Sequence, residues 1–286
     1  MVIKVRSITA MTLGLLIAAS TAFAGQSCDE AYGHGSKEFS VAAGSPGEIG
    51  LIKALAKVFA ADNDARVCWR DADSHQALKA LREKTVDMVM TTAPAAEKTA
   101  VKEGWATQRT LIGSNEYFIV GPVTDPAGAS GAATAADALL RIFNVEEKFF
   151  SRGDNSEANK REMQIWRQLS ATPYGKWYIP VHDDMAAVLD QANKEKGYAM
   201  TDSSTWAMMK NDLPNLKLLF KGDKSLMNAC HALRQPDGAT PGAAMAAKFI
   251  GFMQSKPGQK IILIYGKSQY GEAVYDIAAH AAHYED

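Results

Sequence analysis

At Phe149-Phe150-Ser151-Arg152-Gly153-Asp154-Asn155-Ser156 a short apolar run gives way to a polar turn and then to the start of an amphipathic helix. A strand, a turn and a helix in that order direct free backbone N–H groups and the positive end of the helix dipole at one place. An arginine and two serine hydroxyls lie at the same place. The corner is therefore suited to hold a small anion.

Strands and helices alternate along the rest of the chain, as apolar runs and apolar residues at helical spacing indicate. The expected strands are 39–43, 66–69, 86–90, 117–120, 198–200 and 216–220, with an extended segment at 177–181. The expected helices start at a capping box, Ser45-Pro46-Gly47-Glu48, and at Thr91-Thr92-Ala93-Pro94, and cover 74–84, 156–169, 184–194 and 241–254. This alternation predicts an α/β fold with largely parallel sheets, which bind ligands at the carboxyl ends of their strands.

The chain has 286 residues, which is enough for two lobes of ordinary domain size. We expect the chain to cross between the lobes near 119–123 and again near 227–233. The first lobe would then be discontinuous, made of 25–119 and 231–286, and the second lobe would be 120–230. The helix expected over 241–254 would return to the first lobe.

The first residues predict export. Lys4 and Arg6 give a basic start, an apolar run follows over roughly 8–19, and Ala22-Phe23-Ala24 fits a cleavage site. The apolar run is too short to span a membrane. We therefore interpret 1–24 as a secretory signal peptide that is removed before Gly25, which places the mature protein in the periplasm.

The charge balance limits the classes of binding partner, and the cysteines indicate a disulfide. The chain has 31 basic and 32 acidic side chains, a balance that argues against nucleic acid or an anionic membrane as the main partner. An exported protein can form disulfides, and we expect Cys28 to pair with Cys68 because consecutive strands of a βαβ unit are often neighbours. Cys230 is then the odd thiol. The cysteine spacing does not suggest zinc, and we expect no metal or cofactor.

Four strand-to-helix corners carry hydroxyl groups, two in each expected lobe. A hydroxyl at a helix start usually only caps the helix, which stabilises it by about 1 kcal/mol. Because all four corners lie at the carboxyl ends of strands, a cleft between the lobes would gather them around one ligand. The candidate ligand-binding residues are Ser45, Thr91, Thr92, Ser151, Arg152, Ser156 and Thr201.

Arg152 is the only arginine in the four corners, so we expect it to make the charge-assisted contact with the anion. Asp154 cannot face a fully ionised anion and is expected to cap the helix or to pair with Arg152 and fix its orientation. Glu157 and Asp202 are expected beside the ligand residues.

Several segments resemble a known family. They are 118–122 and 124–128, Ser151 to Ser156, Trp177-Tyr178, 198–202, Pro257-Gly258-Gln259-Lys260 and 270–275. In these the chain is similar to the tungstate-binding proteins of ABC importers, within the type II periplasmic binding protein superfamily. The resemblance implies a two-lobed α/β fold with a ligand cleft between the lobes. It also implies an oxyanion ligand such as tungstate or molybdate, which the protein delivers to a membrane permease and its ATPase. We expect the protein to be a monomer.

The chain departs from that family's pattern at the ligand corners. The family usually carries threonines before a serine where this chain has Ala42-Ala43-Gly44-Ser45, and glycine and threonine where it has Glu157 and Ala158. Hydroxyl donors are therefore missing at Ala42, Ala43 and Ala158, and a carboxylate is added. Each lost hydrogen bond to a charged ligand costs roughly 1.5–3 kcal/mol. A different or organic anion, with Glu157 contacting a protonated or amine group on it, fits these residues as well.

Other functions remain as alternatives. The same fold could serve as a sensor or adaptor module rather than as a transporter component. Arg152-Gly153-Asp154 spells an adhesion tripeptide, but the strand and helix around it predict that it is folded into a cleft. Ser45 and Cys230-His231 are candidate nucleophiles without a recognisable catalytic motif, and adjacent strand residues point to opposite faces, so we expect no enzyme activity.

Two clusters could hold a metal ion. His182-Asp183-Asp184 lies at a helix start, where acidic residues are ordinary caps. His280 and His283 are spaced for one helix face near Glu285 and Asp286, but they are more typical of an exposed chain end. A metal site normally needs three or four converging ligands, which neither cluster supplies in sequence.

Overall fold

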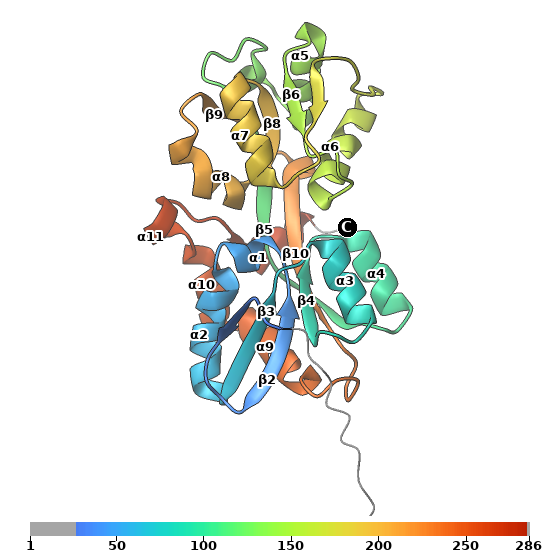
Figure 1. Cartoon of the computed structure of the whole chain (residues 1–286), viewed down its shortest axis with the longest axis vertical. Helices are drawn as coiled ribbons and strands as arrows, with labels where there is room; N and C mark the ends of the chain where they lie inside the picture. Colours follow the sequence, from blue (N-terminus) through green and yellow to red (C-terminus); the bar gives the residue numbers. More distant parts are fainter. Residues whose placement is uncertain (1–26, 285–286) are drawn as a thin grey trace, which may run out of the picture.

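The computed structural model describes residues 27–284 as two α/β lobes, which lie one above the other in Figure 1. The signal peptide expected over 1–24 lies outside the described residues. Within residues 27–284 none of the helices combines the length and the apolar character that a membrane span requires.

Strands are distributed over both lobes of residues 27–284. They are β1 (Glu30–Tyr32), β2 (Lys37–Ala42), β3 (Ala65–Arg70), β4 (Met88–Thr91), β5 (Thr107–Pro122), β6 (Phe149–Ser151), β7 (Tyr178–Pro180), β8 (Tyr198–Asp202), β9 (Leu216–Phe220), β10 (Met227–Arg234) and β11 (Asp276–Ile277).

The α-helices lie between them. They are α1 (Ser45–Glu48), α2 (Leu51–Asn63), α3 (Ser74–Arg82), α4 (Pro94–Lys102), α5 (Ala135–Val145), α6 (Glu157–Gln168), α7 (Met185–Glu195), α8 (Ser203–Met209), α9 (Ala243–Gln254), α10 (Lys256–Ile264), α11 (Lys267–Tyr270) and α12 (Ala278–Ala281). Short 3₁₀ turns are η1 (Ala129–Gly131), η2 (Lys210–Asp212), η3 (Lys224–Leu226) and η4 (Ala282–Tyr284).

The two lobes share one connected system of strands in the order β1-β3-β2-β4-β10-β5-β8-β6-β7, with β9 and β11 also paired to β5. Parallel pairing is found between β2 and its neighbours β3 and β4, and between β6 and its neighbours β7 and β8. The strands that pair with β5 are all antiparallel to it. The α/β fold with two lobes is confirmed, but the sheets are mixed rather than largely parallel. In the lower lobe β10 runs antiparallel to β4, and in the upper lobe β5 runs antiparallel to β8.

Strand β5 connects the lobes. Its first part pairs with β10 as far as Glu116, and from Tyr117 onward it pairs with β8. Figure 1 shows β5 and β10 running side by side from one lobe toward the other. The change of partner falls slightly before the crossing expected at 119–123, and β10 covers the second expected crossing.

Each lobe has its own apolar core. In the lower lobe of Figure 1, Phe39, Phe59 and Phe249 meet with ring centroids 5.0–6.0 Å apart, which joins β2, α2 and α9. In the upper lobe, Trp166 of α6 lies 5.9 Å from Phe149 of β6 and 6.1 Å from Trp177. Separate cores leave the space between the lobes free for polar side chains.

A disulfide joins Cys28 to Cys68, 40 residues apart, and so ties the chain before β1 to strand β3. Cys230 is a buried free thiol in β10.

Candidate functional site

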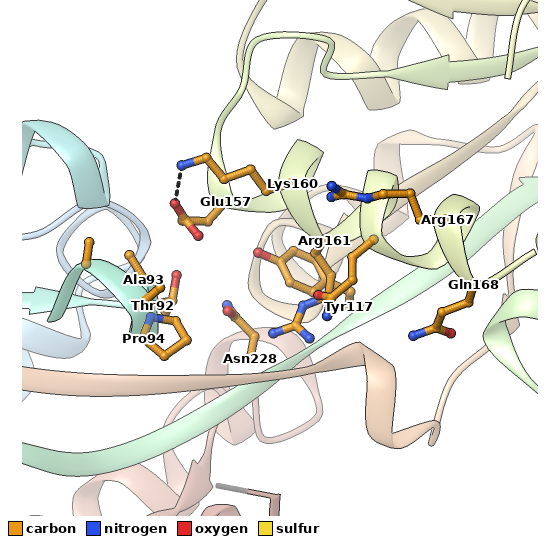
Figure 2. A pocket seen from close by; sticks show the side chains of 13 residues that line it. Thr92, Ala93, Pro94, Tyr117, Glu157, Lys160, Arg161, Arg167, Gln168 and Asn228 are labelled. Carbon is orange, nitrogen blue, oxygen red and sulfur yellow. Dashed lines mark hydrogen bonds and ion pairs between the residues drawn. The ribbon is translucent and has the colours of Figure 1, made fainter. Parts of the chain in front are cut away.

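Two cavities lie between the lobes. The first, of about 610 Å³, is lined from the lower lobe by the starts of α1 and α3 and the end of β4, and from the upper lobe by Arg152, the starts of α6 and α7, and α8. We call it the Arg152 cleft. The second, of about 830 Å³, lies between the start of α4 and the helix α6 (Figure 2), and we call it the α4–α6 pocket.

Most of the predicted ligand residues meet in the Arg152 cleft. The predicted ligand residues that line it are Ser45, Thr91, Thr92, Arg152 and Ser156, and Glu157 and Asp202, which were expected beside them, line it too. Ser151 and Thr201 do not line it. Both are buried inside the upper lobe, with 1% and 0% of their surface exposed.

The turn after β6 sets the position of Arg152. Gly153 has a φ of +61°, and a Cβ at this position would meet the Pro180 Cβ at 2.5 Å, so the tight turn against β7 requires glycine. Asn155 also lies in the left-handed region, with a φ of 60°. The turn delivers the chain to Ser156, whose hydroxyl caps α6 by accepting a hydrogen bond from the Asn159 N–H.

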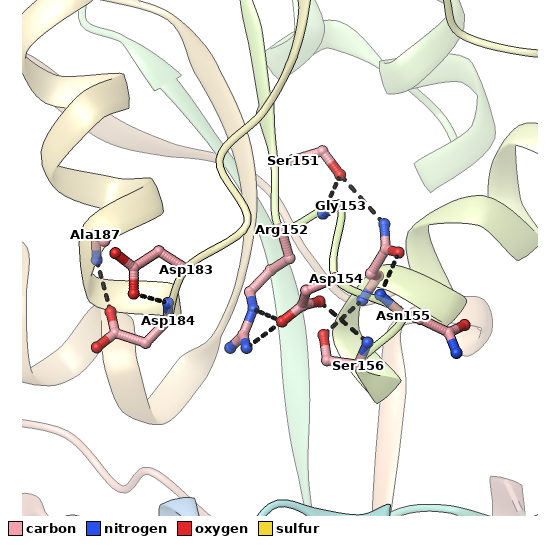
Figure 3. Close-up of polar contacts among 10 residues, drawn as sticks. Ser151, Arg152, Gly153, Asp154, Asn155, Ser156, Asp183, Asp184 and Ala187 are labelled. Carbon is pink, nitrogen blue, oxygen red and sulfur yellow. Dashed lines mark hydrogen bonds and ion pairs between the residues drawn. The ribbon is translucent and has the colours of Figure 1, made fainter.

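Arg152 is held by Asp154 (Figure 3). Its Nε donates to Asp154 Oδ2 at 2.9 Å and its Nη2 donates to the same oxygen, while Asp154 Oδ1 accepts from the Ser156 N–H at 3.0 Å. Partial burial alone would raise the pKa of Asp154, but the hydrogen bonds from Ser156 and Arg152 hold it below its usual value. The carboxylate stays ionised and orients the guanidinium, whose Nη1 keeps its donors for a ligand.

Ser151 is hydrogen-bonded within the upper lobe. Its hydroxyl donates to Glu162 Oε2 at 2.6 Å and accepts from the Gly153 N–H and the Asn159 side chain, each at 3.2 Å. Glu162 also accepts from Trp166 Nε1 at 3.1 Å and from Tyr178 Oη at 2.8 Å. This buried network fixes the base of the turn on which Arg152 stands.

The capping box expected at Ser45 is wrong. Ser45 is the first residue of α1, the cap residue is Gly44, and no side chain caps this helix. Gly50, with a φ of +84°, separates α1 from α2. The Ser45 hydroxyl lies 3.0 Å from Ser204 Oγ and 3.1 Å from Tyr275 Oη, so it faces the cleft beside α8 of the other lobe.

Thr91 and Thr92 differ in what they can offer. The Thr91 hydroxyl donates to the buried Glu97 Oε1 at 2.7 Å, which also accepts from the Ala93 N–H at 2.9 Å. Thr91 therefore holds the start of α4 and has no proton left for an anion. The Thr92 N–H donates to Ser74 Oγ at 3.1 Å, which leaves the proton of that serine available to the cleft.

Six carboxyl groups line the cleft, of which only Glu157 and Asp202 were expected beside the ligand residues. They are Glu48, Asp71, Asp73, Glu157, Asp184 and Asp202. Partial burial, followed by the charges of Asp71, Asp202 and Asp184, raises the pKa of Glu48 to about 7. Asp71 to Ser74 follow β3 and Asp183-Asp184 follow β7, so these two segments carry the same strand-end signal as the four corners.

Three of these acids also stabilise the upper lobe through helix caps or an ion pair. Asp202 caps α8 by accepting from the Ser204 and Thr205 N–H groups at 3.1 and 3.0 Å. Asp184 caps α7 by accepting from the Ala187 N–H at 2.8 Å (Figure 3). Glu157 accepts from Lys160 Nζ at 2.6 Å.

Within residues 27–284 the alternative candidates do not come together as a second site. Glu285 and Asp286, expected near His280 and His283, lie outside the described residues. Burial raises the pKa of the Cys230 thiol to about 12, so it is not a thiolate nucleophile at neutral pH. His231 Nδ1 lies 3.1 Å from Glu97, within the network that holds α4. His280 contacts Asp276 at 2.7 Å on the surface. Among residues 27–284, neither the His182 cluster nor the His280 cluster belongs to a set of three metal-binding side chains that converge on one point.

Comparisons with known proteins identify the family of the chain. The profile of the PBP superfamily domain matches residues 29–257. A Haloferax volcanii protein, named provisionally as the anion-binding protein of an ABC transporter, is 30% identical over 227 residues, which are 76% of this chain and 66% of that protein. The tungstate-binding protein TupA of Peptoclostridium acidaminophilum is 29% identical over 235 residues, 81% of this chain and 82% of that protein. The structure of TupA from Desulfovibrio alaskensis superposes with a TM-score of 0.77 at 32% identity, over 85% of this chain and 99% of that one.

Proposed function

The chain belongs to the PBP superfamily, and we propose that it is the solute-binding component of an ABC importer and captures a small oxyanion between its lobes. The observation that carries the proposal is Arg152, which lines a cavity between the lobes with its orientation fixed by Asp154 and with Nη1 donors to spare. A fixed guanidinium with free donors matches the paired oxygens of an oxyanion. Tungstate and molybdate are the first ions to test, because similar proteins are named for tungstate.

The proposed ligand residues are Arg152 together with the hydroxyl groups of Ser45, Thr92 and Ser156, all of which line the cleft. Thr91 is not among the proposed ligand residues, because its hydroxyl proton is donated to Glu97 and holds the start of α4. Asp154 positions Arg152, and Ser151 supports the turn. Thr201 is fully buried and is left out of the ligand set.

The lobes would move relative to each other about β5 and β10, the two strands that pass between them. We propose the lobe limits 25–119 with 231–286 for the first lobe and 120–230 for the second. Closure would bring Ser45 and Thr92 of one lobe against Arg152 and Ser156 of the other, and so surround the ion with donors from both sides.

We also propose that the protein works as a monomer in the periplasm and delivers its ligand to a membrane permease. The signal peptide expected over 1–24 and the disulfide between Cys28 and Cys68 both fit an oxidising compartment outside the cytoplasm.

A second ligand class has support from the carboxyl groups of the cleft. Glu48 and Asp71 lie on the lower-lobe side, and Asp184 and Glu157 lie on the upper-lobe side. Like charges repel a fully ionised dianion, whereas an organic anion that also carries an ammonium group would satisfy both Arg152 and the acids. An amine-bearing acid is therefore the alternative to an inorganic oxyanion.

The test is a thermal-shift screen followed by calorimetry. Tungstate, molybdate, sulfate, phosphate, small carboxylates and amino acids are added singly to the mature protein, and a bound ligand raises the melting temperature by linkage. The strongest hit is then titrated into the wild type, into Arg152→Ala, and into Arg66→Ala as a matched control. Arg66 also forms an ion pair, with Glu38, but lies on the surface away from the cleft.

We expect Arg152→Ala to lose binding and Arg66→Ala to keep it, with both variants folded by circular dichroism. Equal affinity of Arg152→Ala and the wild type would refute the site. A hit restricted to amino acids would select the amine-bearing ligand over the inorganic oxyanion.

A further inference from the structure

The α4–α6 pocket has walls from both lobes. One wall is the first turn of α4, and the facing wall is one side of α6, with Tyr117 of β5 and Asn228 of β10 between them (Figure 2). The pocket shares Thr92, Tyr117, Glu157 and Asn228 with the Arg152 cleft, so the two cavities adjoin. An extended ligand could reach from one into the other.

The charge of the pocket is opposite to that of the cleft. Its lining carries three basic side chains, Lys160, Arg161 and Arg167, and one acid, Glu157. Lys160 is paired with that acid at 2.6 Å, and Arg167 Nε donates to the Met163 carbonyl at 3.0 Å. Arg161 is partly buried and, within the part of the chain that the structure describes, makes no hydrogen bond or ion pair. Figure 2 shows its guanidinium extending from α6 into the pocket toward Asn228.

The start of α4 supplies donors from the opposite wall. Its nine residues begin with Pro94, and the cap residue Ala93 has no side-chain hydrogen bond to offer. The Ala93 N–H is used by Glu97, but the N–H groups of Ala95 and Ala96 belong to the first turn and have no partner inside the helix. Both residues are exposed and line the pocket, where the helix dipole adds a partial positive charge.

We propose that Arg161 and the first turn of α4 form a second anion subsite, separate from Arg152, that binds a phosphate or carboxylate group. An unpaired guanidinium faces free amides across a cavity whose other charged groups are mainly basic. This is the combination that replaces the water around an oxyanion. The group is either a free ion or the far end of an organic acid whose other end lies in the Arg152 cleft.

Amide chemical shifts of the ¹⁵N-labelled mature protein test the subsite directly. Inorganic phosphate and glutarate, a linear dicarboxylate, are titrated separately at low ionic strength into the wild type, Arg161→Ala, Arg152→Ala and Lys248→Ala. Lys248 is exposed on α9, and its replacement by alanine removes one positive charge far from the pocket. The readout is the shift of the Ala95 and Ala96 amides, which reports this subsite whether or not Arg152 binds a ligand.

We expect saturable shifts of both amides in the wild type and in Lys248→Ala, and at least tenfold weaker binding in Arg161→Ala. Saturation by phosphate identifies a free ion as a sufficient occupant. If only glutarate saturates the amide shifts, and Arg152→Ala also abolishes these shifts, the occupant of the subsite is the far end of a longer organic acid. Absence of a shift with both probes, or equal affinity of Arg161→Ala and the wild type, would overturn the subsite. Because Arg152→Ala is scored separately, failure here leaves the test of the proposed function intact.

Discussion

The Arg152 cleft and the α4–α6 pocket adjoin each other, but the arginine of the cleft is paired with a carboxylate and, within residues 27–284, the arginine of the pocket is not. Arg152 is fixed by two hydrogen bonds to Asp154 and is surrounded by acids from both lobes. Arg161 has no such partner in the described part of the chain, and its neighbours are basic. The cleft therefore holds its guanidinium in a fixed orientation, whereas the pocket offers mainly an excess of positive charge. Selectivity among anions should depend on Arg152, and attraction of anions into the space between the lobes should depend on Arg161.

The largest effect should come from exchanging arginine for lysine at the two positions. Arg152→Lys removes the planar group that contacts Asp154 and the ligand together, so we expect the affinity for the cleft ligand to fall about 100-fold, the loss of roughly two charge-assisted hydrogen bonds. Arg161→Lys keeps the charge and should change phosphate affinity by less than about threefold. Calorimetric titration of both variants measures the difference. Similar losses at the two positions would contradict the division into geometry and charge.

A smaller effect is expected when the partner of each cation is neutralised. Asp154→Asn frees Arg152 from its fixed orientation, and we expect ligand affinity to fall about tenfold, close to one charge-assisted hydrogen bond. Glu157→Gln releases Lys160 toward the pocket and should instead tighten phosphate binding there. Calorimetry at one ionic strength compares the two variants. Tighter binding in Asp154→Asn would mean that Asp154 acts only as a competing charge.

The pH dependence of stability tests the role of the carboxyl groups in the Arg152 cleft. Because the pKa of Glu48 is raised from 4.5 to about 7, the folded protein keeps a proton that the unfolded chain loses over this range. Glu48 therefore contributes stability below about pH 4.5 that is lost as the pH rises through 7. Glu48→Gln should raise the melting temperature of the ligand-free protein relative to the wild type at pH 8 and have little effect at pH 4.5.

The same titration should affect binding, because protonation of Glu48 removes one negative charge from the cleft. Wild-type affinity for an oxyanion should be higher at pH 5.5 than at pH 8, and Glu48→Gln should reduce that difference. Asp62→Asn, which removes an exposed charge from α2, is the matched control and should behave as the wild type. An unchanged pH profile in Glu48→Gln would assign the dependence to another group.

The features that the sequence predicted are those with local causes. The corner at Arg152 follows from a strand, a glycine turn and a serine cap that are adjacent in the chain. The pairing of Cys28 with Cys68 was predicted correctly, but its cause is β1, a strand that was not expected and that pairs antiparallel with β3 next to Cys68. In contrast, the first part of β5 is too polar to be recognised as a strand, and it exists because β10, more than a hundred residues later, pairs with it.

The features that it missed depend on tertiary contacts. Ser45 was expected to cap a helix, but Ser204 and Tyr275 of distant segments take its hydroxyl into the cleft. Ser151 and Thr201 lie at the right strand ends, yet both are buried, which only the packed lobe determines. The raised pKa of Glu48 depends first on its burial and then on carboxylates from three other segments. The basic face of α6 could be seen in the sequence, but its position opposite α4 could not.

The most direct measurement is the position of tungsten in crystals of the mature protein grown with tungstate, located by anomalous scattering. We predict a peak between the lobes, with tungstate oxygens within hydrogen-bonding distance of the Arg152 guanidinium and of at least one hydroxyl from the opposite lobe. A structure in which tungsten binds away from Arg152, or in which saturating tungstate leaves no peak between the lobes, would contradict the account.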